Sequence, residues 1–490
     1  MKNVSILIAL FVISCSNTIN AATSNWGMAN KIIKSIKKTS FPNREYNILD
    51  FGAVPNSTEL ASEAINNAII ACNQNGGGVV IVPKGEFLTG PITLKSNVNF
   101  HLERGAVVKF STRQELYFPP VLTRWEGIDC YTTRPMIYAY GETNIAITGY
   151  GTIDGQGSND NWWPWNGNPK FGWKPGIPSQ KSGSRDRLQM YSEGAVPVAE
   201  RIFSLEDGLR PQLINFYSCN LVLIEGVRLQ NSPFWVIHPV FCKNLIVRGV
   251  HIKSLGPNGD GCDPESCYNV LIDDCYFDTG DDCIAIKSGR NVDGRKWNIP
   301  SENIVIKNCT MKNGHGGVVV GSEISGGFKN LFVENCTMDS PELERVIRVK
   351  TNSCRGGVID GIYVRNIKVG QCKEAVLKIN LDYQHDEICN RDFPPSVKNV
   401  FLDNVQCDRS RYGILIIGLR DTLNINNIQL SNCRFNNVER KYDIKGASNV
   451  RFHNLFINGE NVGNKDWNCI VRKVVILNRN RLQIIDNSEK

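Results

Sequence analysis

The chain has 490 residues, a net charge of +7, 41% hydrophobic residues and 21% charged residues, values that are ordinary for a globular protein. The small positive charge favours an anionic partner only weakly. No Lys/Arg-rich run or groove-reading motif is present, which excludes nucleic acid as an expected partner. No Pro/Ser-rich linker or charge block divides the chain, so we expect one domain after the leader.

The N-terminus has the pattern of an export signal. Lys2 precedes an apolar run over residues 6–13, and small residues follow up to Ala22. The run is too short to span a bilayer. We expect a signal peptide over 1–22 and one mature domain over 23–490, secreted or periplasmic. An alternative is a lipoprotein signal ending before Cys15, which would carry a lipid anchor. No other segment is apolar enough for a membrane span.

The next segments predict an end cap. Residues 47–51 read as a strand and residues 61–72 as an amphipathic helix, and strands follow over 78–83 and 98–110. Residues 111–211 are rich in Trp, Pro and Gly, which predicts a loop insertion. Its WWPW motif has two open interpretations: a ligand-binding surface or a local hydrophobic plug.

A repeated phrase predicts the fold. It reads Asn, apolar, any, apolar, any, Asn/Asp/Gly, then Cys or an apolar residue, and each copy alternates as a strand with one buried face. Copies begin at Asn144, Asn244, Asn269, Asn303, Asn330, Gly361, Asn399, Asn427 and Asn449. From Asn244 the starts are 25, 34, 27, 31, 38, 28 and 22 residues apart. This spacing is too short for propeller blades, which need about 40 residues. We expect an all-β, right-handed parallel β-helix with an N-terminal helical cap and a side-chain ladder of Asn.

The 17 cysteines do not read simply as disulfides. Cys275, Cys309, Cys336 and Cys433 take the same place in the phrase, which predicts a buried ladder of free thiols. Cys262 with Cys267 is a candidate disulfide. No CxxC pair or Cys/His cluster has metal-ligand spacing, so no zinc site is expected.

Four phrases with chemical potential fall on four successive coils. They are Asn258–Gly261 (NGDG), Gly280–Cys283 (GDDC), Gly314–Gly317 (GHGG) and Arg348–Lys350 (RVK). Asp281 lies 12 residues after Asn269, and His315 lies 12 residues after Asn303, so these side chains should stack. Asp260 lies on the adjacent coil. Arg348 and Lys350 share one face of their strand, as do Asn258 and Asp260.

This set of groups fits glycosidic bond cleavage. One carboxylic acid protonates the leaving oxygen and another carboxylate activates water, with about 6.5–9.5 Å between them in inverting enzymes. Crowded carboxylates raise one another's pKa, which would keep one protonated. Each phrase alone is unspecific: paired aspartates are usually solvated, and the Asp-rich turn over 278–282 would also suit calcium.

As an ordered set the four phrases resemble those of glycoside hydrolase family 28, the polygalacturonases and their pectin-degrading relatives. The resemblance covers nearly the whole mature chain. It implies a pectin lyase-like β-helix, no cofactor, and inverting hydrolysis of α-1,4-galacturonide linkages. It also implies that Asp281 is the general acid, that Asp260 and Asp282 hold and activate the water, and that His315 supports the acid or the substrate.

The same resemblance implies a substrate-binding set. Arg348 and Lys350 would bind the galacturonate carboxylate, with Asn258 beside them, and Tyr383 would match a sugar-contacting tyrosine. Gly259 stands where the family has threonine, and Val349 where it has isoleucine.

The mode of attack, the substrate and the class of protein each have alternatives. The stretch over 289–301 and the Trp-rich insertion resemble the loops of exo-acting members, so exo-action is favoured over endo-action. Alternatives are a galacturonidase acting on rhamnogalacturonan or another decorated pectin, a pectate lyase, and a non-catalytic glycan-binding β-helix. A monomer is expected.

Overall fold

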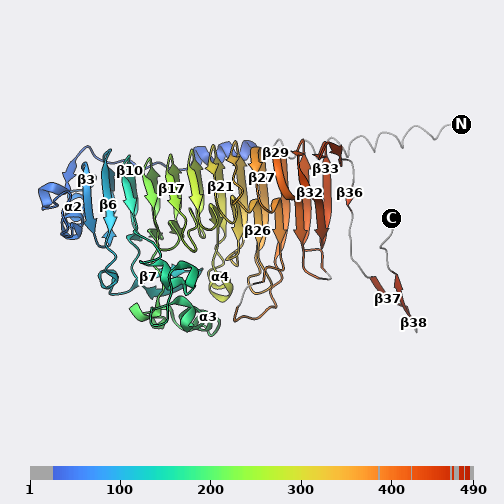
Figure 1. Ribbon diagram of the computed structural model, residues 1–490, viewed down its shortest axis with the longest axis horizontal. Coiled ribbons are helices and arrows are strands. Elements are labelled where there is room, and N and C mark those ends of the chain that lie inside the picture. Colours follow the sequence, from blue (N-terminus) through green and yellow to red (C-terminus); the bar gives the residue numbers. More distant parts are fainter. Residues whose placement is uncertain are drawn as a thin grey trace.

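The computed structural model describes residues 26–384, 387–420 and 422–463, together with the backbone of 466–467, 474–478 and 481–485. These residues form a long stack of coils (Figure 1). Strands of neighbouring coils pair in parallel, as β18 (Tyr268–Asp273) does with β21 (Ser301–Lys307). The predicted all-β, right-handed parallel β-helix is confirmed.

Each coil contributes up to three strands, and equivalent strands stack in columns. The first column contains β1 (Glu45–Asn47), β2 (Gly78–Val82), β5 (Val98–Leu102), β10 (Thr143–Gly149), β13 (Asn220–Glu225), β16 (Lys243–Arg248), β18, β21, β24 (Phe328–Glu334), β27 (Val358–Gln371), β29 (Ser396–Ile417), β30 (Ile425–Ser431) and β33 (Ala447–His453). The second contains β3 (Gly85–Thr89), β6 (Ala106–Phe110), β11 (Thr152–Asp154), β14 (Arg228–Gln230), β17 (His251–Ser254), β19 (Tyr276–Thr279), β22 (Thr310–Met311), β25 (Thr337–Met338), β31 (Arg434–Phe435) and β34 (Phe456–Ile457). The third contains β4 (Ile92–Thr93), β9 (Ile137–Tyr140), β12 (Ile214–Tyr217), β15 (Ile237–Val240), β20 (Ile284–Ile286), β23 (Val318–Gly321), β26 (Arg345–Lys350), β28 (Ala375–Asn380) and β32 (Val438–Lys445). The long strands β27 and β29 continue beyond the first column.

The asparagine that starts each repeat has a structural reason. Asn244, Asn303 and Asn330 adopt left-handed backbone angles, with φ of 55°, 60° and 62°. Asparagine tolerates this region better than most non-glycine residues. Their side chains bond from coil to coil, as when Asn330 Nδ2 donates to Asn303 Oδ1 at 3.0 Å. The predicted asparagine ladder is confirmed.

The cysteine predictions have mixed outcomes. Cys275, Cys309, Cys336 and Cys433 are buried free thiols, as expected. The proposed Cys262–Cys267 disulfide is wrong, because both are buried free thiols of the coil stack. Instead Cys354 is bonded to Cys389, 35 residues along the chain. The two belong to loops that leave the coils, where no repeat pattern reveals which cysteines meet.

The N-terminal end is capped by α2 (Ser62–Gln74), whose apolar face is buried against the first coils, as expected. The strand expected over 47–51 is wrong: β1 ends at Asn47, and a 3-10 helix follows over Ile48–Phe51. The Asn47 side chain accepts a hydrogen bond from the Leu49 amide, which starts that helical turn.

A further helix over residues 26–35 lies along the outside of the coils (Figure 1, blue ribbon). Its Ala29 and Ile32, with Ile36 just beyond it, cover an apolar row on successive first-column strands. That row consists of Ile246, Leu271, Val305 and Phe332. The predicted signal peptide and Cys15 lie outside the described residues. Among the described helices, none is long and apolar enough to cross a membrane.

The insertion predicted over 111–211 is not one segment. Strands β9 to β11 belong to the coil stack, so two excursions, 111–136 and 155–211, flank them. The first contains the hairpin β7 (Val121–Trp125) and β8 (Ile128–Thr132), and the second contains α3 (Arg185–Glu193). Trp162 and Trp165 are 1% exposed and join the core, which favours the hydrophobic-plug interpretation.

Candidate active site

The four predicted phrases meet on four successive coils. The first three lie just before the third-column segment of their coil, and Arg348–Lys350 forms the end of β26. The His315 amide donates to the Asp281 carbonyl at 3.1 Å, so these two residues are level, as their equal offsets predicted. The Gly261 amide donates to the Asp282 carbonyl at 3.0 Å, which places Asp260 level with Asp282.

The three aspartates form one compact cluster. Asp260, Asp281 and Asp282 each have a carboxylate oxygen within 4.8 Å of one on the other two. The Asp282 side chain is fully buried, that of Asp260 is 5% exposed, and that of Asp281 is 18% exposed. These closest approaches are shorter than the 6.5–9.5 Å expected from the sequence for an inverting pair. The gap between the carboxylates is therefore too narrow for the attacking water, which would lie beside the cluster next to the partly exposed Asp281.

Asp281 is paired with His315. The imidazole Nδ1 lies 2.9 Å from Asp281 Oδ1. Burial alone would raise the pKa of Asp281, but the hydrogen bond and charge of His315, with Lys350 and Arg348, hold this pKa well below its usual range. The same bond raises the pKa of His315 to about 9. These shifts favour an ionised Asp281 beside a protonated His315 in the free protein, so Asp281 is not the carboxyl whose pKa crowding raises.

This pairing predicts a defined pH dependence. Because the folded-state pKa of His315 is raised above its ordinary value, its stabilising contribution is complete below about pH 6.5 and is lost as the pH rises through about 9. In an NMR titration we expect the His315 imidazole to titrate near pH 9, and near its ordinary value of about 6.5 in Asp281→Asn. His315→Gln identifies the resonance. A wild-type imidazole that titrates at its ordinary pKa would contradict the pairing.

Asp282 receives both predicted cations. Lys350 Nζ lies 2.7 Å from its Oδ2, and Arg348 NH1 lies 3.3 Å from its Oδ1. Both cations also face the ring of Tyr383, at 5.8 and 5.7 Å from its centroid. Two cations on one carboxylate leave one positive charge in excess, and a guanidinium has several N–H groups to offer an anionic ligand. The predicted binding residues therefore lie together around Asp282.

The pKa of Asp260 is shifted in the opposite direction to that of Asp281. Burial raises its pKa well above the usual range, and the nearby Asp263 and Asp281 raise it further. Lys287 Nζ is 3.7 Å from Asp260 and 3.3 Å from Glu323. Burial also raises the pKa of Asp263 well above its usual range, so in the free protein Asp260 and Asp263 favour the protonated form and Asp281 does not.

Asn258 is positioned by a buried arginine. Arg210 is fully buried and donates to Asn258 Oδ1 at 2.6 Å and to the carbonyl of Pro257 at 2.7 Å. This arginine comes from the second excursion, 47 residues before Pro257.

The sequence analysis missed Asp263, Lys287, Glu323 and Arg210. Asp263 and Lys287 could have been found from their positions on the same coils, because Asp263 lies three residues after Asp260 and Lys287 lies five residues after Asp282. Glu323 and Arg210 have no motif of their own, because only the path of the loops brings them to the site.

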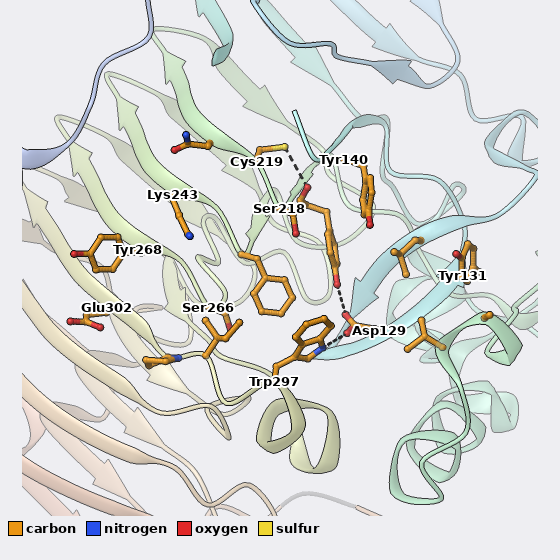
Figure 2. Close-up of a pocket in the computed structure, with 18 residues that line it drawn as sticks. Asp129, Tyr131, Tyr140, Ser218, Cys219, Lys243, Ser266, Tyr268, Trp297 and Glu302 are labelled. Carbon is orange, nitrogen blue, oxygen red and sulfur yellow. Dashed lines mark hydrogen bonds between the residues drawn. The ribbon is translucent and has the colours of Figure 1, made fainter. Parts of the chain in front are cut away.

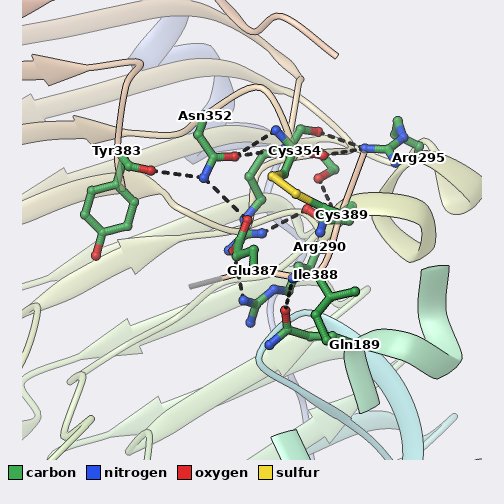
Figure 3. Close-up of a disulfide and its surroundings, with 12 residues drawn as sticks. Gln189, Arg290, Arg295, Asn352, Cys354, Tyr383, Glu387, Ile388 and Cys389 are labelled. Carbon is green, nitrogen blue, oxygen red and sulfur yellow. Dashed lines mark hydrogen bonds and ion pairs between the residues drawn. A yellow bond between two sulfur atoms is a disulfide. The ribbon is translucent and has the colours of Figure 1, made fainter. Parts of the chain in front are cut away.

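Loops from three regions meet beside this cluster (Figure 3). Arg290 ion-pairs with Glu126 and with Glu387, both at 2.8 Å. The disulfide ties Cys389 to Cys354 in the loop after β26, and the bond from the Ile388 amide to Gln189 on α3 ties the same loop to the second excursion. The helix α4 (Asn291–Trp297) follows Arg290 and lies near α3, as Figure 1 also shows.

Among the described residues, the aspartate cluster is a group of carboxylates that could hold a cation. Its three carboxylates lie within reach of one ion, although Lys350 and Arg348 already neutralise Asp282. The calcium alternative over 278–282 placed Asp278 in the ligand set, but Asp278 Oδ1 accepts a bond from Asn313 Nδ2 at 2.8 Å. The absence of a metal requirement stays a prediction.

Comparisons with known proteins bear on this cluster. The family model "Glycosyl hydrolases family 28" matches residues 204–448, which include all the predicted site residues. The chain is 30% identical over 358 residues to a probable polygalacturonase of Vitis vinifera, covering 70% of this chain and 65% of that protein. It is 25% identical over 448 residues to an exo-poly-alpha-D-galacturonosidase of Dickeya chrysanthemi, covering 86% of this chain and 72% of that protein.

Solved structures give a similar result. A hyperthermoactive exopolygalacturonase from Thermotoga maritima is 40% identical, with a TM-score of 0.85, over 89% of this chain and 96% of that one. A family 28 exopolygalacturonase of Yersinia enterocolitica, at 23% identity and a TM-score of 0.64 over 88% of this chain and 78% of that one, shares the fold. The ordered phrases, their assembly on adjacent coils and the family match agree, and the chain belongs to glycosyl hydrolases family 28.

Proposed function

We propose that this protein hydrolyses α-1,4-galacturonide linkages of pectin, with inversion, from a chain end. The proposal rests on one observation: the Asp281–His315 pair lies next to the Asp282–Arg348–Lys350 group on adjacent coils. The first group holds a proton and faces solvent. The second provides excess positive charge for a sugar carboxylate.

The residue roles follow from this geometry. Asp281 delivers the proton to the leaving oxygen as the glycosidic C–O bond breaks, and the proton held by His315, 2.9 Å away, supplies that carboxyl. Water held by Asp260 and Asp282 attacks the anomeric carbon, and its proton passes to the Asp282 carboxylate. Arg348 and Lys350 bind the galacturonate carboxylate, Tyr383 lies against the same cations, and Asn258 is held beside Asp260 by Arg210.

Two lines support exo-action. The Thermotoga and Dickeya relatives are exo-acting by name. In this chain the excursion with α3, the helix α4 and the disulfide-tied loop at Cys389 meet beside the aspartates, where they would limit the length of glycan that fits. From the leader sequence we also propose that the protein is secreted or periplasmic. We further propose that it acts as a monomer.

The test is product analysis on polygalacturonic acid and on a rhamnogalacturonan backbone side by side. We expect reducing ends from polygalacturonic acid with chelator present and without new ultraviolet absorbance. Early products should be monomer or dimer only, released as the β-anomer in a proton NMR time course. A ladder of mixed oligomers would show endo-action, and chelator-sensitive ultraviolet absorbance would show a lyase. Release from rhamnogalacturonan alone would favour the decorated-pectin alternative.

A further inference from the structure

A second hollow lies outside the catalytic cluster (Figure 2). It has a volume of about 1010 Å³ and is formed where third-column strands turn into first-column strands, with Tyr131 and Val198 of the two excursions and Trp297 of α4 around it. None of the predicted site residues lines it.

Its floor is a stack of three strained turns. Ser218, Phe241 and Ser266 occupy equivalent places on three coils and have left-handed backbone angles, with φ of 54°, 54° and 51°. Such angles cost energy for residues other than glycine and occur often at functional sites. The Ser266 hydroxyl is buried and has no hydrogen-bond partner among the described residues. A buried hydroxyl without a partner is costly, which together with its backbone angle marks this turn as strained.

Beside the floor runs a row of hydrogen-bonding side chains. Asn220, Lys243, Tyr268 and Glu302 are paired in register on four successive coils. Coils repeat at about 4.8 Å, so the row offers polar groups at regular intervals along the coil axis. This arrangement suits a chain-like ligand that lies along the β-helix and carries hydroxyl groups at regular intervals.

The walls provide fixed aromatic rings. Tyr140 is 52% exposed and stacks on Tyr217 with ring centroids 5.5 Å apart. Trp297 is 46% exposed, and its indole N–H donates to Asp129 Oδ2 at 2.7 Å, while the Tyr217 hydroxyl donates to Asp129 Oδ1 at 3.0 Å. Rigid rings with one apolar face open pack on the C–H faces of sugars without loss of side-chain entropy.

The charges exclude a strong preference for acidic sugars. Asp129 is neutralised by Arg124, whose Nε lies 2.7 Å from it. In the polar row, Lys243 is balanced by Glu302 two coils away. The cationic pair Arg348–Lys350 has no counterpart among the residues that line the hollow. We infer that this hollow, the aromatic groove, is an ancillary binding site for an uncharged pyranose oligosaccharide.

The experiment uses the full chain and β-1,4-galactotetraose as the neutral probe, with trigalacturonate for comparison. Binding is followed by calorimetry and by ligand-observed NMR. Tyr268→Ala removes one ring of the row and should weaken galactotetraose binding about 2- to 10-fold. Turnover of polygalacturonic acid should stay unchanged, because Tyr268 is absent from the catalytic cluster. Tyr150→Ala, at a tyrosine 63% exposed elsewhere on the surface, is the matched control and should bind normally.

Three outcomes would overturn the inference. The first is no galactotetraose binding by the wild type, or equal binding by Tyr268→Ala. The second is trigalacturonate binding that is lost in Tyr268→Ala but kept in Tyr150→Ala, which would show that the groove takes an acidic ligand. The third is self-association in sedimentation that is lost in Tyr268→Ala, which would show that the groove contacts a second copy. Turnover is measured separately, so failure here is distinguishable from failure of the proposed hydrolysis.

Discussion

Replacing Asp281 with asparagine is expected to lower kcat on polygalacturonic acid by about 100- to 10,000-fold while the fold stays intact. Asparagine keeps the shape of the side chain but has no proton to give to the leaving oxygen. Circular dichroism should match the wild type, and thermal unfolding should stay cooperative with only the small loss of stability expected from breaking the pair with His315. Asp278→Asn is the control, because this aspartate belongs to the same Asp-rich turn over 278–282 but bonds to Asn313. A near-normal kcat for Asp281→Asn would disprove its role.

The leaving group separates the acid from the base. If Asp281 protonates the leaving oxygen, its loss should matter little for a dinitrophenyl galacturonide, whose phenolate leaves without a proton. Asp260→Asn should stay slow on both substrates, because it removes a group that holds the water. Since Asp260 is the carboxyl with the raised pKa, the reverse pattern would make Asp260 the acid. Either pattern assigns the two roles from measured rates.

The second large effect is expected at Lys350. Lys350→Met removes the cation 2.7 Å from the fully buried Asp282 carboxylate and leaves Arg348, at 3.3 Å, as the remaining cation. Removing one partner of a buried pair costs about 3–5 kcal/mol, and we expect the lower end because one cation stays. We also expect a rise in KM, because the galacturonate carboxylate loses a partner. Chemical denaturation and steady-state kinetics measure the two effects.

Two variants make this test specific. Lys398→Met breaks a pair with Asp360 in which the side chains are 48% and 31% exposed, and such surface pairs contribute at most about 1 kcal/mol. Asp282→Asn combined with Lys350→Met should cost less than the sum of the single changes, since the Lys350 cation and the Asp282 carboxylate are removed together and neither is left to face the loss of the other. Additive costs would show that the pair is not coupled.

Much of the fold could be predicted from the repeat. The recurring asparagine fixed the register, because a left-handed turn accepts few other side chains and its amide bonds to the next coil. With the register known, equal offsets from Asn269 and Asn303 placed His315 on Asp281. The same logic correctly grouped the buried thiols at Cys275 and Cys309.

Loops have no such repeat, and there the predictions were weakest. The Cys262–Cys267 disulfide is wrong, and the one between Cys354 and Cys389 joins loops that are distant in sequence. The prediction of one insertion over 111–211 is wrong although it spans the repeat copy at Asn144, which forms β10 in the coil stack between the two excursions.

By itself the sequence determined the coil stack, the family and the residues that gather at the site, because a periodic fold converts spacing into proximity. The tertiary structure decided where the protons lie. One carboxyl of the set was expected to have a raised pKa, and the structure assigns that shift to Asp260, whereas His315 lowers the pKa of Asp281. Charge states depend on burial and on partners such as Asp263, Lys287 and Arg210, which loops and neighbouring coils bring together and no local pattern reveals. The aromatic groove, built from turns and excursions, was likewise visible only in three dimensions.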